Sequence, residues 1–106
     1  MSEKVYDVKI TPLALEDLDG IYSYICDEQK EPQIAEKFIQ TIEEKILSLS
    51  SMPEKYTLCD QEMLRKKGYR KLIIKSYVAF YLVDERHQKV IIARVLYSAR
   101  DYEKLI

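Results

Sequence analysis

The chain has 106 residues, of which 47% are apolar and 33% are charged. This balance excludes an intrinsically disordered chain and predicts a single globular domain over residues 1–106. No segment approaches the roughly 18 consecutive apolar residues of a membrane span, and the N-terminal stretch MSEKVYDVKI lacks a hydrophobic signal region. We therefore expect a cytoplasmic protein that has no membrane partner.

The residues that most often bind metals are few and widely spaced. Cys26 and Cys59 lie far apart in the sequence, and His87 is the single histidine. Zinc sites and His-dependent catalytic triads need richer and closer sets of such residues. We expect free thiols and no metal site.

The charges are distributed unevenly, although the net charge is only −1. Residues 1–64 hold 6 Lys+Arg against 14 Asp+Glu, a net charge of −8, whereas residues 65–106 hold 11 against 4, a net charge of +7. A surface that binds phosphate is therefore expected in the second part of the chain.

The first part reads as a strand followed by two helices. Residues 5–10, VYDVKI, alternate apolar and polar side chains as a half-buried strand does. Thr11 and Pro12 then form a helix start, an N-cap followed by proline at the first helical position. Residues 27–31 read as a polar connector, and Pro32 starts a second helix that should pack antiparallel to the first. Apolar residues recur at helical spacing in both segments: Ala14, Leu18, Ile21, Tyr22 and Ile25, then Ala35, Phe38, Ile42, Ile46 and Leu49.

The second part changes to the pattern of strands. Residues 54–64 look irregular, and three runs rich in β-branched and aromatic residues follow at 69–75, 77–84 and 89–97. Their tight links predict an antiparallel meander. The fold class is therefore α+β in the order β–α–α–β–β–β, with a helical hairpin on one face of a small, mainly antiparallel sheet. The acidic helices should cover that face and leave the basic residues on the open side of the sheet.

This order of elements, together with four stretches of sequence, resembles the RelE/ParE superfamily of bacterial toxins from type II toxin–antitoxin modules. The stretches are ITPLALEDLDGIYSYI, AEKFIQTIEEKILSLSSMP, GYRKLIIKSYVAFYLVD and VIIARVLYSARDYEKL. The resemblance implies a small toxin held inactive by a cognate antitoxin, without metal or organic cofactor. The Tyr22/Tyr24 pair is expected to pack within the protein, and an exposed part of the helices could form a groove for the antitoxin.

The resemblance leaves the cellular target open. RelE-like members cleave mRNA on the ribosome, whereas ParE-like members inhibit DNA gyrase and are not nucleases. The charge of +7 in the second part favours a metal-independent endoribonuclease, an mRNA interferase that stops translation. A gyrase inhibitor and a degenerate member that only binds its antitoxin are the alternatives.

The resemblance also implies where RNA chemistry would be located. Cleavage needs a base, cations that stabilise the phosphorane, and an acid for the leaving oxygen. Arg70, Arg94 and Arg100 would neutralise phosphate, and Tyr97 and Tyr102 would stack a base or shuttle a proton. Further RNA contacts are predicted at Arg65, Lys66, Lys67 and Lys71.

Each of these residues also has a purely structural interpretation. Arg70 could tie the sheet edge to a carboxylate such as Asp84 or Asp101, and Arg94 must lie on an open face or in an ion pair because it interrupts an apolar strand. Val78 and Ser98 stand where the RNA-cleaving relatives carry catalytic residues. A tyrosine hydroxyl is also a weak general base at neutral pH. These departures favour the gyrase alternative.

Overall fold

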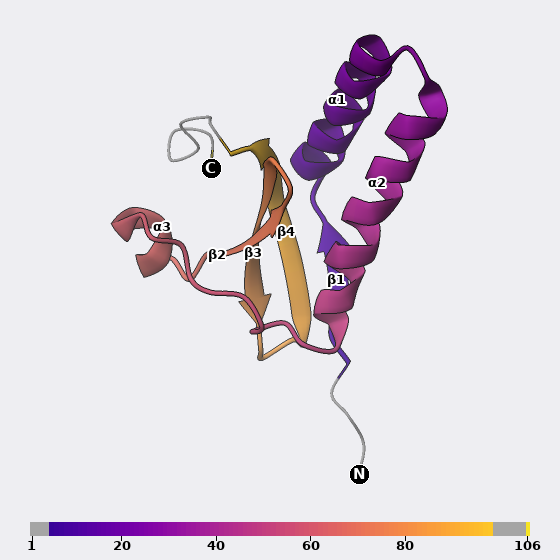
Figure 1. Ribbon diagram of the computed structural model, residues 1–106. Coiled ribbons are helices and arrows are strands. Elements are labelled where there is room, and N and C mark those ends of the chain that lie inside the picture. Colours follow the sequence, from indigo (N-terminus) through magenta and orange to yellow (C-terminus); the bar gives the residue numbers. More distant parts are fainter. Residues whose placement is uncertain (1–4, 99–105) are drawn as a thin grey trace.

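The computed structural model describes residues 5–98 and 106, and its elements follow the predicted β–α–α–β–β–β order (Figure 1). The strand order is β1-β4-β3-β2, with β1 parallel to β4 and the other neighbours antiparallel. The predicted mainly antiparallel sheet is therefore confirmed. The elements are β1 (Asp7–Ile10), α1 (Pro12–Gln29), α2 (Pro32–Leu47), the 3-10 helix η1 (Ser48–Ser50), α3 (Glu62–Lys66), β2 (Arg70–Ile74), β3 (Tyr77–Asp84) and β4 (Lys89–Tyr97).

The two long helices begin where the sequence predicts. Thr11 is extended, its side chain accepts a hydrogen bond from the backbone N–H of Ala14 at 3.2 Å, and Pro12 opens the first turn of α1. The first helix ends later than expected, at Gln29, because the polar residues of the predicted connector are adequate helix formers. Lys30 then reverses the chain with a left-handed φ of 59°.

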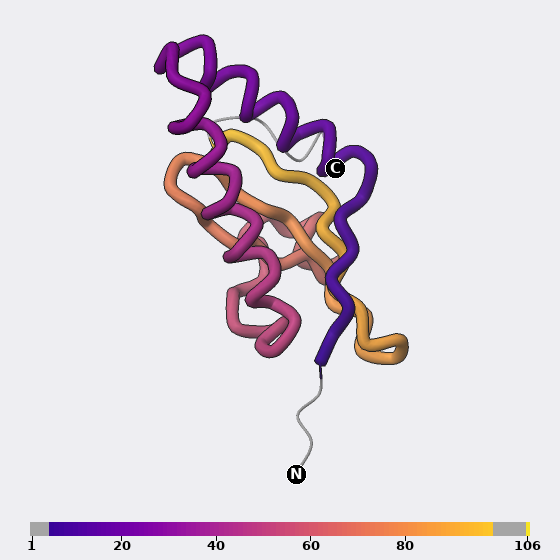
Figure 2. Tube along the Cα trace, turned by 90° about the vertical axis from the view of Figure 1, so that its right-hand side faces the viewer, coloured from indigo at the N-terminus to yellow at the C-terminus, as the bar shows by residue number. Residues whose placement is uncertain are grey.

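The helical hairpin covers one face of the sheet and buries the main core. Figure 1 shows α1 and α2 side by side, and Figure 2 shows them from the helical side, diverging from the turn that joins them. The buried stripes of both helices meet alternate residues of the strands, as a half-buried sheet requires. The largest fully buried members of this core are Ile42, Ile46, Leu49, Leu72, Ile74, Tyr81, Val90, Ile92 and Val95.

The opposite face of the sheet differs from the prediction, because it is not an open basic surface. Val78, Phe80 and Leu96 form a second buried apolar cluster there with Cys59 and Leu64. Leu64 belongs to the short helix α3, in a segment expected to be irregular. That segment therefore folds back and covers apolar side chains that the strands present on this face.

A β-bulge interrupts the pairing of β3 with β4. Phe80 lies opposite Arg94, but the next residue, Tyr81, lies opposite Ile92. Ala93 is therefore the extra residue, and such bulges bend a strand and redirect the side chains that follow. The C-terminal half of β4, where the predicted site lies, thus leaves the register of its first half.

Candidate functional site

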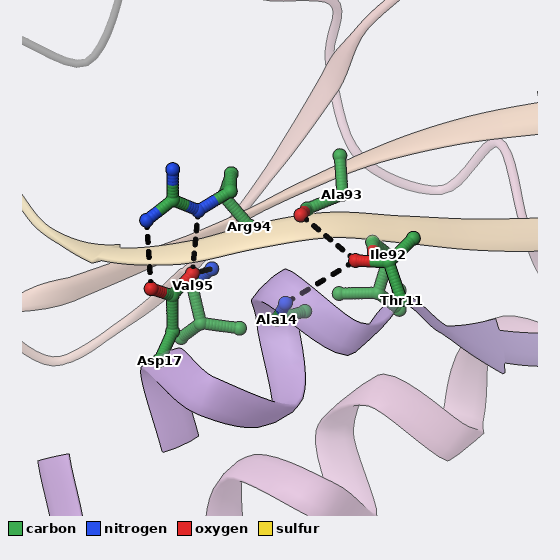
Figure 3. Close-up of polar contacts among 7 residues, drawn as sticks. All are labelled: Thr11, Ala14, Asp17, Ile92, Ala93, Arg94 and Val95. Carbon is green, nitrogen blue, oxygen red and sulfur yellow. Dashed lines mark hydrogen bonds and ion pairs between the residues drawn. The ribbon is translucent and has the colours of Figure 1, made fainter. Parts of the chain in front are cut away.

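The start of α1 is fastened to the bulge of β4. The Thr11 hydroxyl donates to the carbonyl oxygens of Ile92 at 2.9 Å and Ala93 at 3.0 Å, and its backbone N–H reaches Ile92 as well (Figure 3). The same hydroxyl oxygen accepts from Ala14. One threonine therefore caps the helix and satisfies strand carbonyls beyond the end of β1.

Asp17 on α1 continues this attachment along the edge of β4. Its carboxylate accepts from Arg94 Nε and Nη2, both at 2.8 Å, and from the backbone N–H of Val95 at 2.9 Å (Figure 3). The side chains of Arg94 and Asp17 are only 16% and 12% exposed. The hydrogen bond to Asp17 raises the pKa of Arg94. Of the two environments expected for Arg94, the structure therefore has the ion pair.

A cavity of about 540 Å³ opens between α1 and the end of β4. We call it the tyrosine pocket, because three tyrosines line it together with the acidic residues Glu16 and Asp17. The tyrosines come from three different elements, Tyr24 from α1, Tyr77 from β3 and Tyr97 from β4. The sequence-predicted residue Tyr97 therefore lines a cavity, with its side chain 49% exposed.

The tyrosines of this pocket form part of an aromatic row. The ring centroid of Tyr77 lies 5.7 Å from that of Tyr97, edge to face, and 5.7 Å from that of Phe38, with the two rings tilted. Burial raises the pKa of Tyr77, and the nearby hydroxyls of Tyr24 and Tyr97 raise it further. Among the described lining residues there is no lysine or arginine, so the pocket favours cations rather than phosphate.

The predicted basic residues of β2 are bound to the preceding loop. Arg70 donates from Nη1 to the carbonyl oxygen of Tyr56 at 2.6 Å, and its Nη2 lies 3.9 Å from Glu54 Oε2. Lys71 pairs with Asp60 at 2.9 Å, and this hydrogen bond lowers the pKa of Asp60. Both cations therefore hold the segment that covers the second face of the sheet.

The basic run of residues 65–67 lies at the C-terminal end of α3 rather than in a loop. Lys66 pairs with Glu62 one turn earlier at 3.0 Å, and both side chains are mostly exposed. Arg65 and Lys67 are exposed as well. Cations suit a helix C-terminus, so this run has a structural explanation besides the predicted RNA contact.

The residues predicted nearest the C-terminus, Arg100 and Tyr102, lie outside the described residues, as does Asp101. Asp84, the other carboxylate considered for Arg70, instead accepts from the backbone N–H of His87 at 3.1 Å. The ring Nδ1 of that histidine lies 2.9 Å from the same carboxylate. The structure thus joins Arg70 to a carboxylate as the structural interpretation expected, but to a different one.

The two positions that depart from the RNA-cleaving relatives have structural roles. Val78 is 6% exposed and packs against Phe80 and Leu96 in the second apolar cluster. Ser98 donates its backbone N–H to the carbonyl oxygen of Ser76 at 2.8 Å, which joins the end of β4 to the β2–β3 turn. An arginine at the Val78 position would place a charge inside this cluster.

Two further observations concern ligands and membranes. Within residues 5–98 and 106, no three or more His, Cys, Asp or Glu side chains gather closely enough to hold a metal ion. None of the helices in that part of the chain is long and apolar enough to cross a membrane.

Solved structures with the same fold come from toxin–antitoxin systems. The chain is 24% identical to a chain of the chromosomal ParDE system of P. aeruginosa, with a TM-score of 0.73, covering 90% of this chain and 98% of that one. It is 23% identical to a chain of the RelBE2 toxin–antitoxin complex of Mycobacterium tuberculosis, with a TM-score of 0.64, covering 88% and 98%. A mutant of the E. coli toxin RelE in the free state is 14% identical, with a TM-score of 0.64 and coverage of 95% and 92%.

A comparison with models of protein families identifies the family, although none of the curated protein sequences matches the chain. Residues 8–102, which include every described strand and helix apart from the first residue of β1, match the model of the ParE toxin of the type II toxin–antitoxin system parDE. The chain therefore belongs to the ParE toxin family, within the RelE/ParE superfamily of toxins from type II toxin–antitoxin systems.

Proposed function

We propose that this toxin stops growth by binding DNA gyrase, as ParE-like members do, and that it cleaves no RNA. The observation that carries the proposal is that the basic side chains predicted to bind phosphate are paired with carboxylates of the chain itself. Arg70, Lys71 and Arg94, all predicted to neutralise or bind phosphate, each pair with a carboxylate from the acidic first part of the chain. A phosphodiester would compete with the exposed carboxylates of Glu54 and Asp60, and it would have to break the buried Asp17 pair, which is costly.

The surroundings of Tyr97 support the same proposal. Of the two tyrosines predicted to shuttle a proton, this is the one that the structure describes. Its pocket, however, is lined by the acidic residues Glu16 and Asp17. Asp17 is already paired with Arg94, but the carboxylate of Glu16 adds negative charge to the pocket. Negative charge repels phosphate and opposes the charge that develops during RNA cleavage. Val78 replaces an expected arginine and is buried. These features of the described residues support a toxin that acts by binding rather than by catalysis.

RNA cleavage is the second candidate, and one observation favours it. Arg65, Lys66 and Lys67 form a compact, exposed basic run on α3, and such a run can contact phosphates. Under this alternative Arg100 and Tyr102, which lie outside the described residues, would supply the missing chemistry. A ribosome-bound mRNA would then be the substrate.

We also infer that an antitoxin is the regular partner of this chain. The RelBE2 structure, which has the same fold, is a toxin–antitoxin complex, and the ParDE chain comes from a toxin–antitoxin system. The partner is expected to be a small protein with a segment that folds when it binds the toxin.

The test uses the purified chain with two targets. We expect it to inhibit plasmid supercoiling by DNA gyrase at near-stoichiometric amounts and to leave ribosome-bound mRNA intact. Tyr97→Phe keeps the ring and removes the hydroxyl, so it should inhibit gyrase as the unsubstituted chain does. Cleavage of the mRNA that disappears in Tyr97→Phe would overturn the proposal in favour of the nuclease. Soluble chain that affects neither target would indicate a degenerate member.

A further inference from the structure

Gly20 lies in the middle of α1, on the wall of the tyrosine pocket. Glycine weakens a helix interior relative to alanine, and the usual compensation is a close contact with a neighbouring element or a left-handed φ. Gly20 is helical, and a Cβ at this position would meet no atom of the described chain within 4 Å outside its own stretch of helix. The glycine therefore leaves space on α1 that none of the described neighbours fills.

This space lies between a carboxylate and an aromatic ring on one stripe of α1. Glu16 lies one turn before Gly20 and Tyr24 one turn after it, and all three residues line the tyrosine pocket. Both side chains are exposed, that of Tyr24 by 59%. A side chain of a partner can therefore reach the pocket over the glycine, with the carboxylate on one side and the ring on the other.

The charge of this surface is negative even after its ion pair is counted. Asp17 holds Arg94 in two hydrogen bonds at the edge of the pocket (Figure 3). Glu16 is also near enough to Arg94 to raise the pKa of the guanidinium group. Two carboxylates beside one guanidinium leave one negative charge in excess. The faces of tyrosine rings add to the attraction for a cation.

We propose that the tyrosine pocket binds an arginine side chain of DNA gyrase, which enters over Gly20 between Glu16 and Tyr24. A planar guanidinium group can stack on an aromatic ring and pair with a carboxylate at the same time. The aliphatic part of the arginine would cover the buried side chains of Ile21 and Val95, which also line the pocket. This inference rests on the proposed function, in which gyrase is the target.

The chemistry of gyrase suits this pocket. An enzyme that holds DNA presents arginine and lysine side chains to the phosphates. The carboxylate of Glu16 offers such a side chain a charged acceptor in place of a phosphate. The toxin would then bind gyrase through the acidic first part of its chain rather than through its basic second part.

The experiment measures the Kd between the labelled chain and purified DNA gyrase by fluorescence anisotropy. Gly20→Gln fills the space over the glycine, and Glu16→Gln removes the negative charge with little change of shape. Ser23→Gln and Glu28→Gln are matched controls, since both positions are exposed on α1 and lie outside the tyrosine pocket. The Kd should rise about tenfold or more for Gly20→Gln and about fivefold for Glu16→Gln. The controls should change the Kd by less than about twofold.

Gly20→Gln also separates a loss of binding from a loss of folding. Glutamine is a better helix former than glycine, so this variant should unfold at the same urea concentration as the unsubstituted chain or at a higher one. Salt separates the two pocket variants from each other. The effect of Glu16→Gln should shrink between about 0.05 M and about 0.5 M salt, because ions screen the lost attraction. The effect of Gly20→Gln is steric and should persist.

Several outcomes would overturn the proposal. Pocket variants that bind gyrase as tightly as the controls would remove the site and leave gyrase as the target. A loss of affinity in Gly20→Gln with none in Glu16→Gln would overturn the assignment of an arginine. Pocket variants that keep gyrase inhibition but lose the antitoxin, or a second copy of the chain, would assign the pocket to that partner. If the unsubstituted chain neither binds nor inhibits gyrase, the proposed function and this inference fail together.

Discussion

Replacing Asp17 by alanine should strongly destabilise the fold, because this carboxylate holds α1 to the edge of β4. The substitution removes the acceptor of three hydrogen bonds, two from Arg94 and one from the backbone of Val95. Arg94 is only 16% exposed and would lose its counter-charge. Removing one partner of a buried ion pair costs about 3–5 kcal/mol. Because both side chains keep some contact with water, we expect about 3 kcal/mol, a large part of a total of roughly 5–15 kcal/mol.

Urea unfolding followed by circular dichroism measures this loss directly. Asp19→Ala is the matched control, since Asp19 is exposed on the same helix and its loss should change the free energy of unfolding by less than about 0.5 kcal/mol. Combining Asp17→Ala with Arg94→Met should cost less than the sum of the two single changes, because the stranded charge is then absent. A loss below about 1 kcal/mol for Asp17→Ala would refute the reasoning that this pair secures the end of β4.

Three further predictions concern single residues. Tyr81→Phe removes a buried hydroxyl that donates to the Pro53 carbonyl at 2.9 Å and should cost about 1 kcal/mol in urea unfolding. Burial raises the pKa of Tyr81 from 10.0 to about 12, so its contribution to stability is complete below pH 10 and is lost as the pH rises to about 12. Urea midpoints that fall over this pH range as much in Tyr81→Phe as in the unsubstituted chain would contradict this. Gly20→Ala should stabilise α1 by up to about 1 kcal/mol, because a Cβ there meets no atom within 4 Å. Gly68→Ala should destabilise the fold by about 1 kcal/mol, because its φ of +89° is strained for alanine. Urea unfolding that finds Gly20→Ala less stable, or Gly68→Ala more stable, than the unsubstituted chain would contradict these predictions. The Cys59 thiol is fully buried and burial raises its pKa, so iodoacetamide should leave it unmodified in the folded chain but not in urea, as mass spectrometry would show.

The sequence predicted the elements whose causes are local. Thr11 and Pro12 start α1 through capping and a fixed φ. Pro32 starts α2 through its fixed φ, without a capping hydrogen bond from the side chain of Glu31. The three β-rich runs became β2, β3 and β4 with bounds within one residue of those expected. Their β-branched and aromatic residues leave little choice but a sheet with buried faces.

The candidate site could not be predicted in the same way, because long-range pairs make it. Asp17 and Arg94 are 77 positions apart, and no local pattern links them. The uneven charge of the two parts indicated a basic face, but net charge does not reveal pairing. Arg94 and Lys71 cross the boundary between the parts to reach Asp17 and Asp60. The tyrosine pocket was missed for the same reason, since its three rings come from distant elements.

The most direct test of the account is pulse labelling of DNA and protein synthesis after this chain alone is induced in bacteria. A toxin that binds gyrase should reduce thymidine incorporation first, while methionine incorporation continues at the outset. Early loss of methionine incorporation with DNA synthesis still intact would contradict the account and indicate RNA cleavage instead.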